Sequence, residues 1–249
     1  MSRRLRLWLL GPALLGNGAL LAWAVAGLPK FGNYHGPYGL VLNHIVVPLR
    51  HSTNVVMGTT FDVRGVDTMG EEFILYAAVV GVTLLLRDES AGSRVERRTR
   101  RLRSEAVRLL GVLMVGGGLL VGLWLVAFGY ITPGGGFPGG VVLAGAILVL
   151  YLVGSHRDYR PFRDEHVLDP LEGLGAGGYV ATGLAALAAG MQFLTNLFGH
   201  GKPGTLLSSG SIGVLNAASG LAVTVAMLLL FSEFLETYVA PLEPEDVGS

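Results

Sequence analysis

Long apolar runs alternate with short charged segments along this chain, and six of the runs are long enough to cross a bilayer as α-helices. A helix needs about 20 consecutive apolar residues to span the hydrocarbon core of a membrane. The six runs cover residues 7–28, 68–86, 106–129, 138–154, 171–194 and 210–231. The pattern therefore predicts an all-α, polytopic integral membrane protein with about six transmembrane helices.

The segment 38–61 is also fairly apolar, but Pro48, Arg50, His51 and Asn54 interrupt it. Counting it as a crossing would also move the Arg-rich segment that follows the second span to the outside of the membrane. Polar or irregular backbone is tolerated at membrane depth only where protein covers it. We therefore expect one interfacial or partly inserted helix here, in addition to the six spans.

Composition agrees with a membrane protein and narrows the possible chemistry. Of the 249 residues, 51% are hydrophobic and 14% are charged, whereas soluble domains average about 25% charged residues. The absence of cysteine excludes disulfides and thiolate metal sites. The six histidines show no metal-ligand spacing, and no Ser-His-Asp arrangement stands out. We expect no metal, no cofactor and no enzyme activity of the chain by itself.

The basic residues set the expected orientation in the membrane. Most of the 18 Lys and Arg residues lie before the first span, between the second and third, or between the fourth and fifth. Because positively charged loops stay in the cytoplasm, both termini are expected there. The Arg-rich linker 88–103 could instead bind anionic lipid or nucleic acid, but a topology determinant is the simpler interpretation. It divides the chain into a two-span module, 1–87, and a four-span module, 104–249.

A charged cluster at the start of the second span is the strongest candidate for chemistry. Its members are Asp62, Arg64, Asp67, Glu71 and Glu72. Ionisable groups at membrane depth are costly and often mark an ion or proton pathway. A structural explanation also exists, because acids suit the first turn of a helix and Thr68 with Glu71 has the spacing of a capping box. Helical periodicity separately places Glu72 on one face with Tyr76 and Thr83, as a polar stripe along the span.

Two further motifs concern helix packing. The loop between the third and fourth spans is rich in glycine but lacks the Gly-Lys-Ser/Thr that grips phosphate, so it predicts a tight turn between antiparallel helices. Its residues are Pro133, Gly134, Gly135, Gly136, Phe137, Pro138, Gly139 and Gly140. In the last span Asn216 is a single amide among small residues. We expect it to hydrogen-bond across a helix interface, with ion coordination as the alternative.

These motifs resemble those of Mrp-type multisubunit sodium/proton antiporters. Asn54-Val55-Val56, followed by Phe-Asp-Val-Arg-Gly-Val-Asp-Thr-Met-Gly-Glu at 61–71, is similar to the C-terminal tail of the large A subunit. The glycine-rich loop and the four-span layout of 104–249 resemble the small B subunit. The chain departs from the family at Met57, where a second Asn is usual, at Val63, where Phe is usual, and at Glu72, which is apolar in many relatives.

The resemblance implies a membrane subunit of a multisubunit cation/proton antiporter in a bacterial or archaeal cytoplasmic membrane. Its implied partners are the other antiporter subunits, the lipid bilayer, Na⁺ and H⁺, and no nucleic acid. It also implies that Glu71, Asp67 and Asp62 serve an ion pathway with Arg64 beside them. Family position ranks Glu71 first, whereas periodicity selects Glu72. The alternatives are a subunit of the membrane arm of a complex-I-like hydrogenase or oxidoreductase, and a scaffold that touches no ion.

Overall fold

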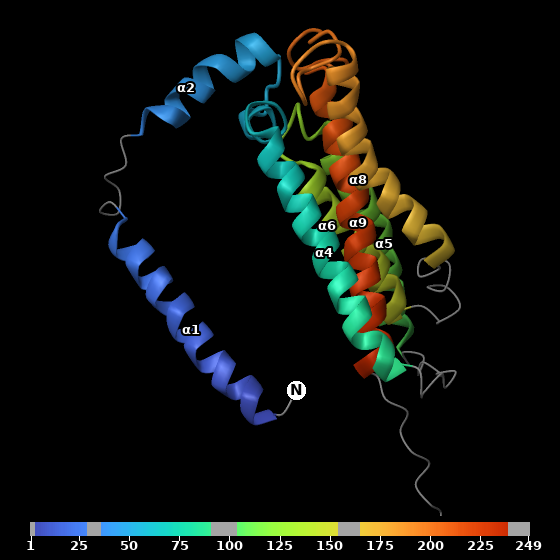
Figure 1. Ribbon diagram of the computed structural model, residues 1–249. Helices are drawn as coiled ribbons and strands as arrows, with labels where there is room; N and C mark the ends of the chain where they lie inside the picture. Colours follow the sequence, from blue (N-terminus) through green and yellow to red (C-terminus); the bar gives the residue numbers. More distant parts are fainter. Residues whose placement is uncertain (1–2, 29–35, 91–103, 154–164, 239–249) are drawn as a thin grey trace, which may run out of the picture. The chain divides into compact units, whose positions relative to one another are not determined.

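A computed structural model describes residues 3–28, 36–90, 104–153 and 165–238, and within these ranges the chain forms helices and no strand. The long helices are α1 Arg3–Ala26, α4 Gly65–Ser90, α5 Glu105–Phe128, α6 Gly136–Val153, α8 Glu165–Ala188 and α9 Ser211–Tyr238. The chain divides into two compact units, Met1–Val41 and Leu42–Ser249. The first unit contains α1. The second contains the remaining long helices, which lie side by side as a bundle (Figure 1).

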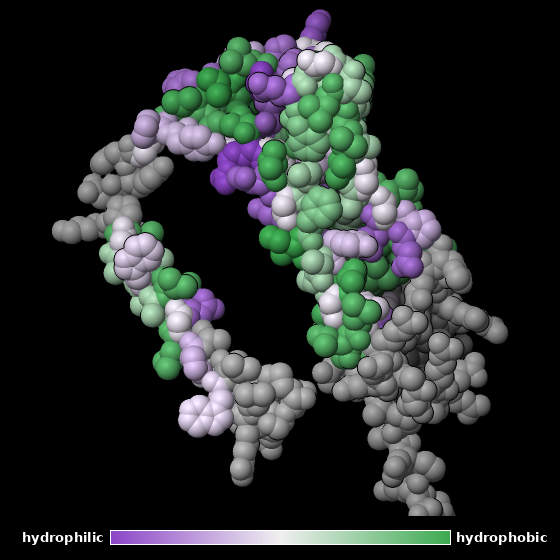
Figure 2. Space-filling view, in the orientation of Figure 1, coloured by the Kyte–Doolittle hydropathy of each residue, from purple (hydrophilic) through white to green (hydrophobic). Residues whose placement is uncertain are grey.

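Helix α9 is the centre of this bundle, since it packs against α4, α5, α6 and α8. One hydrophobic cluster joins Leu168 of α8 and Ala144 of α6 to Val225 and Leu228 of α9. A second cluster lies near the start of α9 and includes Met57, Phe61, Tyr130, Tyr179, Leu194, Ile212 and Leu215. Hydrophobic side chains cover much of the outside of the bundle (Figure 2), as expected where lipid or other subunits replace water.

Four of the described helices are long and apolar enough to cross a membrane: Gly65–Leu86, Glu105–Phe128, Gly136–Val153 and Ser211–Phe234. All four overlap predicted spans. The first predicted span forms α1, in which the apolar segment Leu14–Ala26 is shorter than these four. The helical class of the fold is therefore confirmed, and the number of spans predicted from sequence exceeds the four that satisfy both length and hydropathy.

The predicted span 171–194 has different limits in the structure. Helix α8 covers Glu165–Ala188 and ends in a left-handed residue, Gly190, with φ 77°. The Gly190 N–H donates to the carbonyl of Leu187 at 2.9 Å, which is one of the two bonds of a Schellman helix end. The residues that follow form an irregular loop to 210, so the helix ends before residue 194, the predicted end of the span.

The segment expected to form one interfacial helix is broken into short pieces instead. They are α2 Pro37–Ile45, the π-helical turn η1 Val46–Arg50, α3 Val55–Gly58 and the π-helical turn η2 Thr59–Val63. His51 adopts a left-handed φ of 54°, which turns the chain between η1 and α3. The expectation that protein covers the polar groups holds for Asn54. Its amide nitrogen donates to the carbonyls of Gly129 at 2.7 Å and Thr132 at 3.1 Å.

The division into modules at the Arg-rich linker rests on sequence resemblance and stays a prediction. Helix α4, from the first module, packs on α9 and α8 of the second. Most of the linker, residues 91–103, lies outside the described residues.

Candidate functional site in the membrane bundle

Helix α4 begins earlier than the sequence predicts, and this changes the role of Thr68. The turn η2 runs almost directly into α4 at Gly65, so Thr68 lies inside the helix and cannot be its N-cap. The predicted capping box with Glu71 is therefore wrong. The Thr68 hydroxyl instead donates to the backbone carbonyl of Thr60 at 2.7 Å and ties η2 to α4.

Glu72 is the buried acid of the predicted cluster. It lies one turn after Thr68 on the face of α4 that meets α9, and only 4% of its surface is exposed. The hydroxyl of Ser219, itself fully buried on α9, donates to Glu72 Oε1. A carboxyl is thus held between two spanning helices by a side-chain hydrogen bond. Such a group can be neutralised by a proton or by a cation, which is the chemistry that an ion pathway requires.

The stripe predicted to include Glu72, Tyr76 and Thr83 is only partly realised. Tyr76 is 44% exposed, because a spacing of four residues carries it past the centre of the buried face. The next residue buried on this face after Glu72 is Val79, with 2% exposed.

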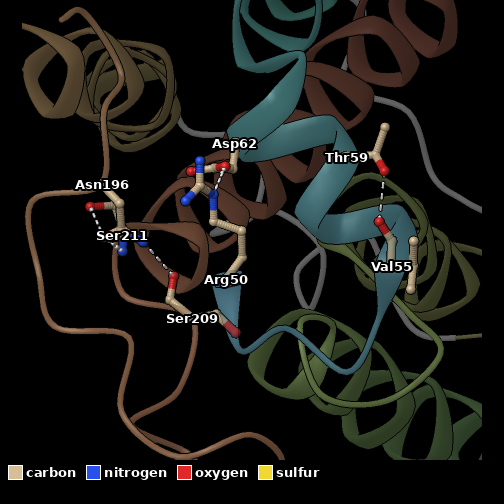
Figure 3. A network of polar contacts seen from close by, with 7 residues as sticks. All are labelled: Arg50, Val55, Thr59, Asp62, Asn196, Ser209 and Ser211. Carbon is tan, nitrogen blue, oxygen red and sulfur yellow. Dashed lines mark hydrogen bonds and ion pairs between the residues drawn. The ribbon is translucent and has the colours of Figure 1, made fainter. Parts of the chain in front are cut away.

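The other members of the charged cluster lie at the surface of this chain or in ion pairs. Glu71 is exposed on the outer face of α4. Asp67 is paired with Arg64, and both side chains are more than half exposed. Asp62 is paired with Arg50 and is 9% exposed (Figure 3). Arg64 therefore neutralises Asp67, and Arg50 neutralises Asp62.

The glycine-rich loop and Asn216 form one interhelical joint. Asn216 is fully buried; its Oδ1 accepts from the N–H of Gly136 at 2.6 Å, and its Nδ2 donates to the carbonyl of Val126. A Cβ at Gly136 would lie 2.7 Å from the backbone nitrogen of Gly220 and would also meet the backbone carbonyl of Asn216. Gly135 has φ 148°, a conformation that favours glycine. Asn216 therefore makes the interhelical bonds expected of it, and the turn brings α6 against α9.

Two buried residues of α8 were not predicted as site residues. Tyr179 is fully buried, and its hydroxyl donates to the carbonyl of Gly65 at 2.9 Å, at the start of α4. Glu172 is 8% exposed. Both lie on the buried face of α8 at helical spacing, and that spacing is the signal by which the sequence could have revealed them.

A polar network closes the end of the bundle where α4 and α9 begin. Asn196 accepts from the Ser211 N–H at 2.8 Å and donates to the Ser209 carbonyl at 3.0 Å, which fixes the loop before α9 (Figure 3). The Ser209 hydroxyl donates to the His51 carbonyl at 3.1 Å. The rings of His51 and His200 stand edge to face, with centroids 5.8 Å apart. Within the described residues no group of three or more His, Asp or Glu side chains could hold a metal ion.

The histidine of this network predicts a pH dependence. Burial, and then the positive charges of Arg50 and His51, hold the pKa of His200 below its ordinary value of 6.5, while Asp62 acts in the opposite direction. The folded loop therefore binds fewer protons than the unfolded one, and stability falls as pH drops below about 6.5. We expect the thermal unfolding midpoint to decrease on mild acidification, and His200→Gln to reduce this decrease. His44→Gln, at an exposed histidine of α2, should leave it unchanged; an identical acid response in His200→Gln would contradict the assignment.

Fold and site together define an all-helical, multi-pass membrane protein with a carboxyl held between its spanning helices. The particular family follows from comparison with known proteins. A family model described as a domain related to the MnhB subunit of Na⁺/H⁺ antiporters matches residues 106–229. The chain belongs to this family and is a membrane subunit of the Na⁺/H⁺ antiporter type, which confirms the resemblance read from the glycine-rich loop.

Two known proteins resemble the chain over most of its length. The chain is 30% identical over 211 residues to an uncharacterized protein of Methanocaldococcus jannaschii, covering 75% of this chain and 76% of that protein. It is similar to a chain in the structure of the membrane-bound sulfane sulfur reductase, an archaeal respiratory membrane complex, with a TM-score of 0.70 and 30% identity over 93% of this chain and 98% of the other.

A chain of the Mrp complex from Dietzia sp. has the same fold, with a TM-score of 0.63 and 23% identity. The match covers 98% of this chain but 27% of the longer one. Both solved relatives are subunits of multisubunit membrane complexes. The fusion of an A-subunit tail, 1–87, to a B-like module stays a prediction, because the family match lies within the second module alone.

Proposed function

We propose that the chain works in a multisubunit Na⁺/H⁺ antiporter and contributes carboxylates to an ion pathway between subunits. The observation that carries this proposal is Glu72, buried between α4 and α9 and bonded by Ser219. Holding an ionisable group inside a membrane bundle costs about 2.5–3.5 kcal/mol or more. A protein with only a structural task would gain stability from an apolar residue there.

In this mechanism Glu72 takes up a proton or Na⁺ and releases it when the other ion arrives. Glu71, the next residue, points outward from α4, where a neighbouring subunit would cover it and share the pathway. The ion pairs of Asp62 with Arg50 and of Asp67 with Arg64 stand at the start of α4 and would lie at the entry of this pathway. In this role the chain moves ions without converting any substrate chemically and is a secondary transporter subunit.

The same proposal places the chain in a bacterial or archaeal cytoplasmic membrane with both termini in the cytoplasm. The support is the distribution of arginine, which favours the cytoplasmic side for the segments 88–103 and 154–164. The start of α4, with its ion pairs, would then face the extracytoplasmic side, and lipid would contact the exposed apolar faces of the bundle.

A second candidate function is a subunit in the membrane arm of a redox-driven complex. The match over nearly the full length of a chain in the sulfane sulfur reductase complex favours it. The two candidates differ in what drives cation movement, since an antiporter needs only ion gradients, whereas a redox-driven pump needs electron transfer.

The test is to purify the native complex through a tag on this chain, identify its other subunits and reconstitute it in proteoliposomes. We expect an imposed pH gradient to drive Na⁺ uptake with no electron donor or acceptor present. The control is the same liposomes with an ionophore that collapses the pH gradient. Co-purification with redox subunits, together with Na⁺ movement only during electron transfer, would replace the antiporter by the second candidate.

A further inference from the structure

A second buried carboxyl, Glu172, lies on α8 and takes no part in the mechanism above. It belongs to a regularly spaced buried face formed with Leu168, Gly175 and Tyr179, whose spacing of three or four residues marks one side of a helix. Leu168 packs in a cluster with Val225 and Leu228 of α9. A Cβ at Gly175 would lie 2.7 Å from the backbone nitrogen of Ala222. Glu172 stands between these two contacts, so it faces the stretch of α9 from about 222 to 228.

The described surroundings of Glu172 on α9 are apolar. It is 92% buried, and its Oε1 has no hydrogen-bond partner among the residues that the structure describes. The facing stretch of α9 contributes Ala222, Val225 and Ala226 as buried side chains. Among the described residues, a charged group close to it is Asp169, one turn earlier on α8 and exposed. A like charge there adds to the cost of a carboxylate at Glu172 and does not offset it.

Glu172 and Glu72 approach the same helix from two neighbours. Glu72 meets α9 at Ser219, and Gly175, one turn from Glu172, meets α9 at Ala222. The contacts at Ser219 and Ala222 are separated by about 4.5 Å along the axis of α9, at a rise of 1.5 Å per residue, and Glu172 lies about one turn further along. Helices α4 and α8 also contact each other. The interior of the bundle therefore holds two carboxyls in succession, Glu72 and Glu172. Tyr179 is bonded to Gly65 at the start of α4, so Glu72 lies between that bond and Glu172.

We propose that Glu172 is a second proton-binding site, in series with Glu72 on the side of the bundle where α8 begins. This proposal rests on the function proposed above and extends its pathway to α8. Glu172 takes up one proton to become the neutral acid, and gives that proton up again.

The experiment compares Glu172→Gln with Asp169→Asn, an exposed acid three residues away on the same helix, in the purified and reconstituted complex. We expect Glu172→Gln to lower pH-driven Na⁺ exchange about tenfold or more, the scale of losing one proton-transfer group. It should also remove a carboxylic-acid C=O band from the infrared difference spectrum between acid and alkaline pH. Asp169→Asn should retain both the exchange rate and the infrared band. An unchanged exchange rate in an intact Glu172→Gln complex would overturn the proposal.

Two further variants make every outcome decisive. If Glu172→Gln does not assemble, Glu172→Asp keeps the carboxyl and should retain the band and part of the exchange; failure of both to assemble would show a structural role and overturn the proposal. Glu72→Gln separates the proposal of a second site at Glu172 from the proposed function as a whole. Loss of exchange in Glu72→Gln but not in Glu172→Gln removes only the second site. Full exchange in both variants would remove the proposed pathway itself.

Discussion

Glu72→Gln should abolish Na⁺/H⁺ exchange while the complex still assembles. Glutamine has nearly the same volume and can still accept the hydrogen bond from Ser219, so the α4–α9 contact survives. It cannot take up a proton or balance a cation, so the step that needs a titrating group is lost. We expect exchange to fall to about a tenth of the original rate or less. The measurement is the recovery of a quenched pH-sensitive dye on adding Na⁺ to everted membrane vesicles, normalised to the amount of assembled complex.

The controls for this variant separate a pathway from a scaffold. Glu105→Gln changes an exposed acid in the first turn of α5 and should leave exchange unchanged. Glu71→Gln, at the position that family resemblance ranked first, should also reduce exchange if the outer face of α4 shares the pathway. A Glu72→Gln complex that exchanges ions at the original rate would exclude Glu72 from the mechanism. Loss of assembly with normal activity in whatever complex remains would identify the chain as a scaffold.

Gly136→Ala should disrupt the joint between α6 and α9. The added Cβ would lie 2.7 Å from the nitrogen of Gly220 and would meet the carbonyl of Asn216, and both are backbone atoms that cannot rotate away. Separation of the helices would also stretch the bond from the Gly136 N–H to Asn216. Overpacking of this kind costs about 3 kcal/mol. We expect a clear fall in the thermal unfolding midpoint in detergent and in the amount of chain recovered in the complex.

The matched control is Gly145→Ala on the same helix. A Cβ at Gly145 has no heavy atom within 4 Å among those that the structure describes, and alanine is the better helix former by about 1 kcal/mol. Gly145→Ala should therefore leave the unfolding midpoint unchanged or raise it. Equal behaviour of the two variants would show that the close approach at Gly136 is not what holds α6 against α9.

The apolar runs predicted the helices well because length and hydropathy are local properties. Helices α4, α5, α6 and α9 follow directly from them. The interruption of the helix between α2 and α4 was harder to predict from sequence. The left-handed His51 and the bonds from Asn54 to Gly129 and Thr132 depend on partners far along the chain. The sequence marked both Asn216 and the glycine-rich loop, but not that they bind each other across 80 residues.

The candidate site was predicted as a cluster but not residue by residue. Adjacent positions such as Glu71 and Glu72 differ by about 100° around a helix, so a small uncertainty in rotation decides which acid is buried. Periodicity selected the buried one, Glu72, whereas capping-box spacing misplaced Thr68 because η2 continues into α4. Glu172 escaped notice because it follows Pro170 near the start of α8, where an acid reads as an ordinary helix-start residue.

The central place of α9 has a consequence for how the protein is made. Helices leave the ribosome in chain order, and α9 follows every helix against which it packs. Until α9 arrives, α4 has no Ser219 to meet Glu72 and α6 has no Asn216 to meet Gly136. Newly inserted α4 and α6 must therefore wait in the bilayer with polar groups unmatched. Insertion factors that shelter them during this interval should govern the yield of the subunit.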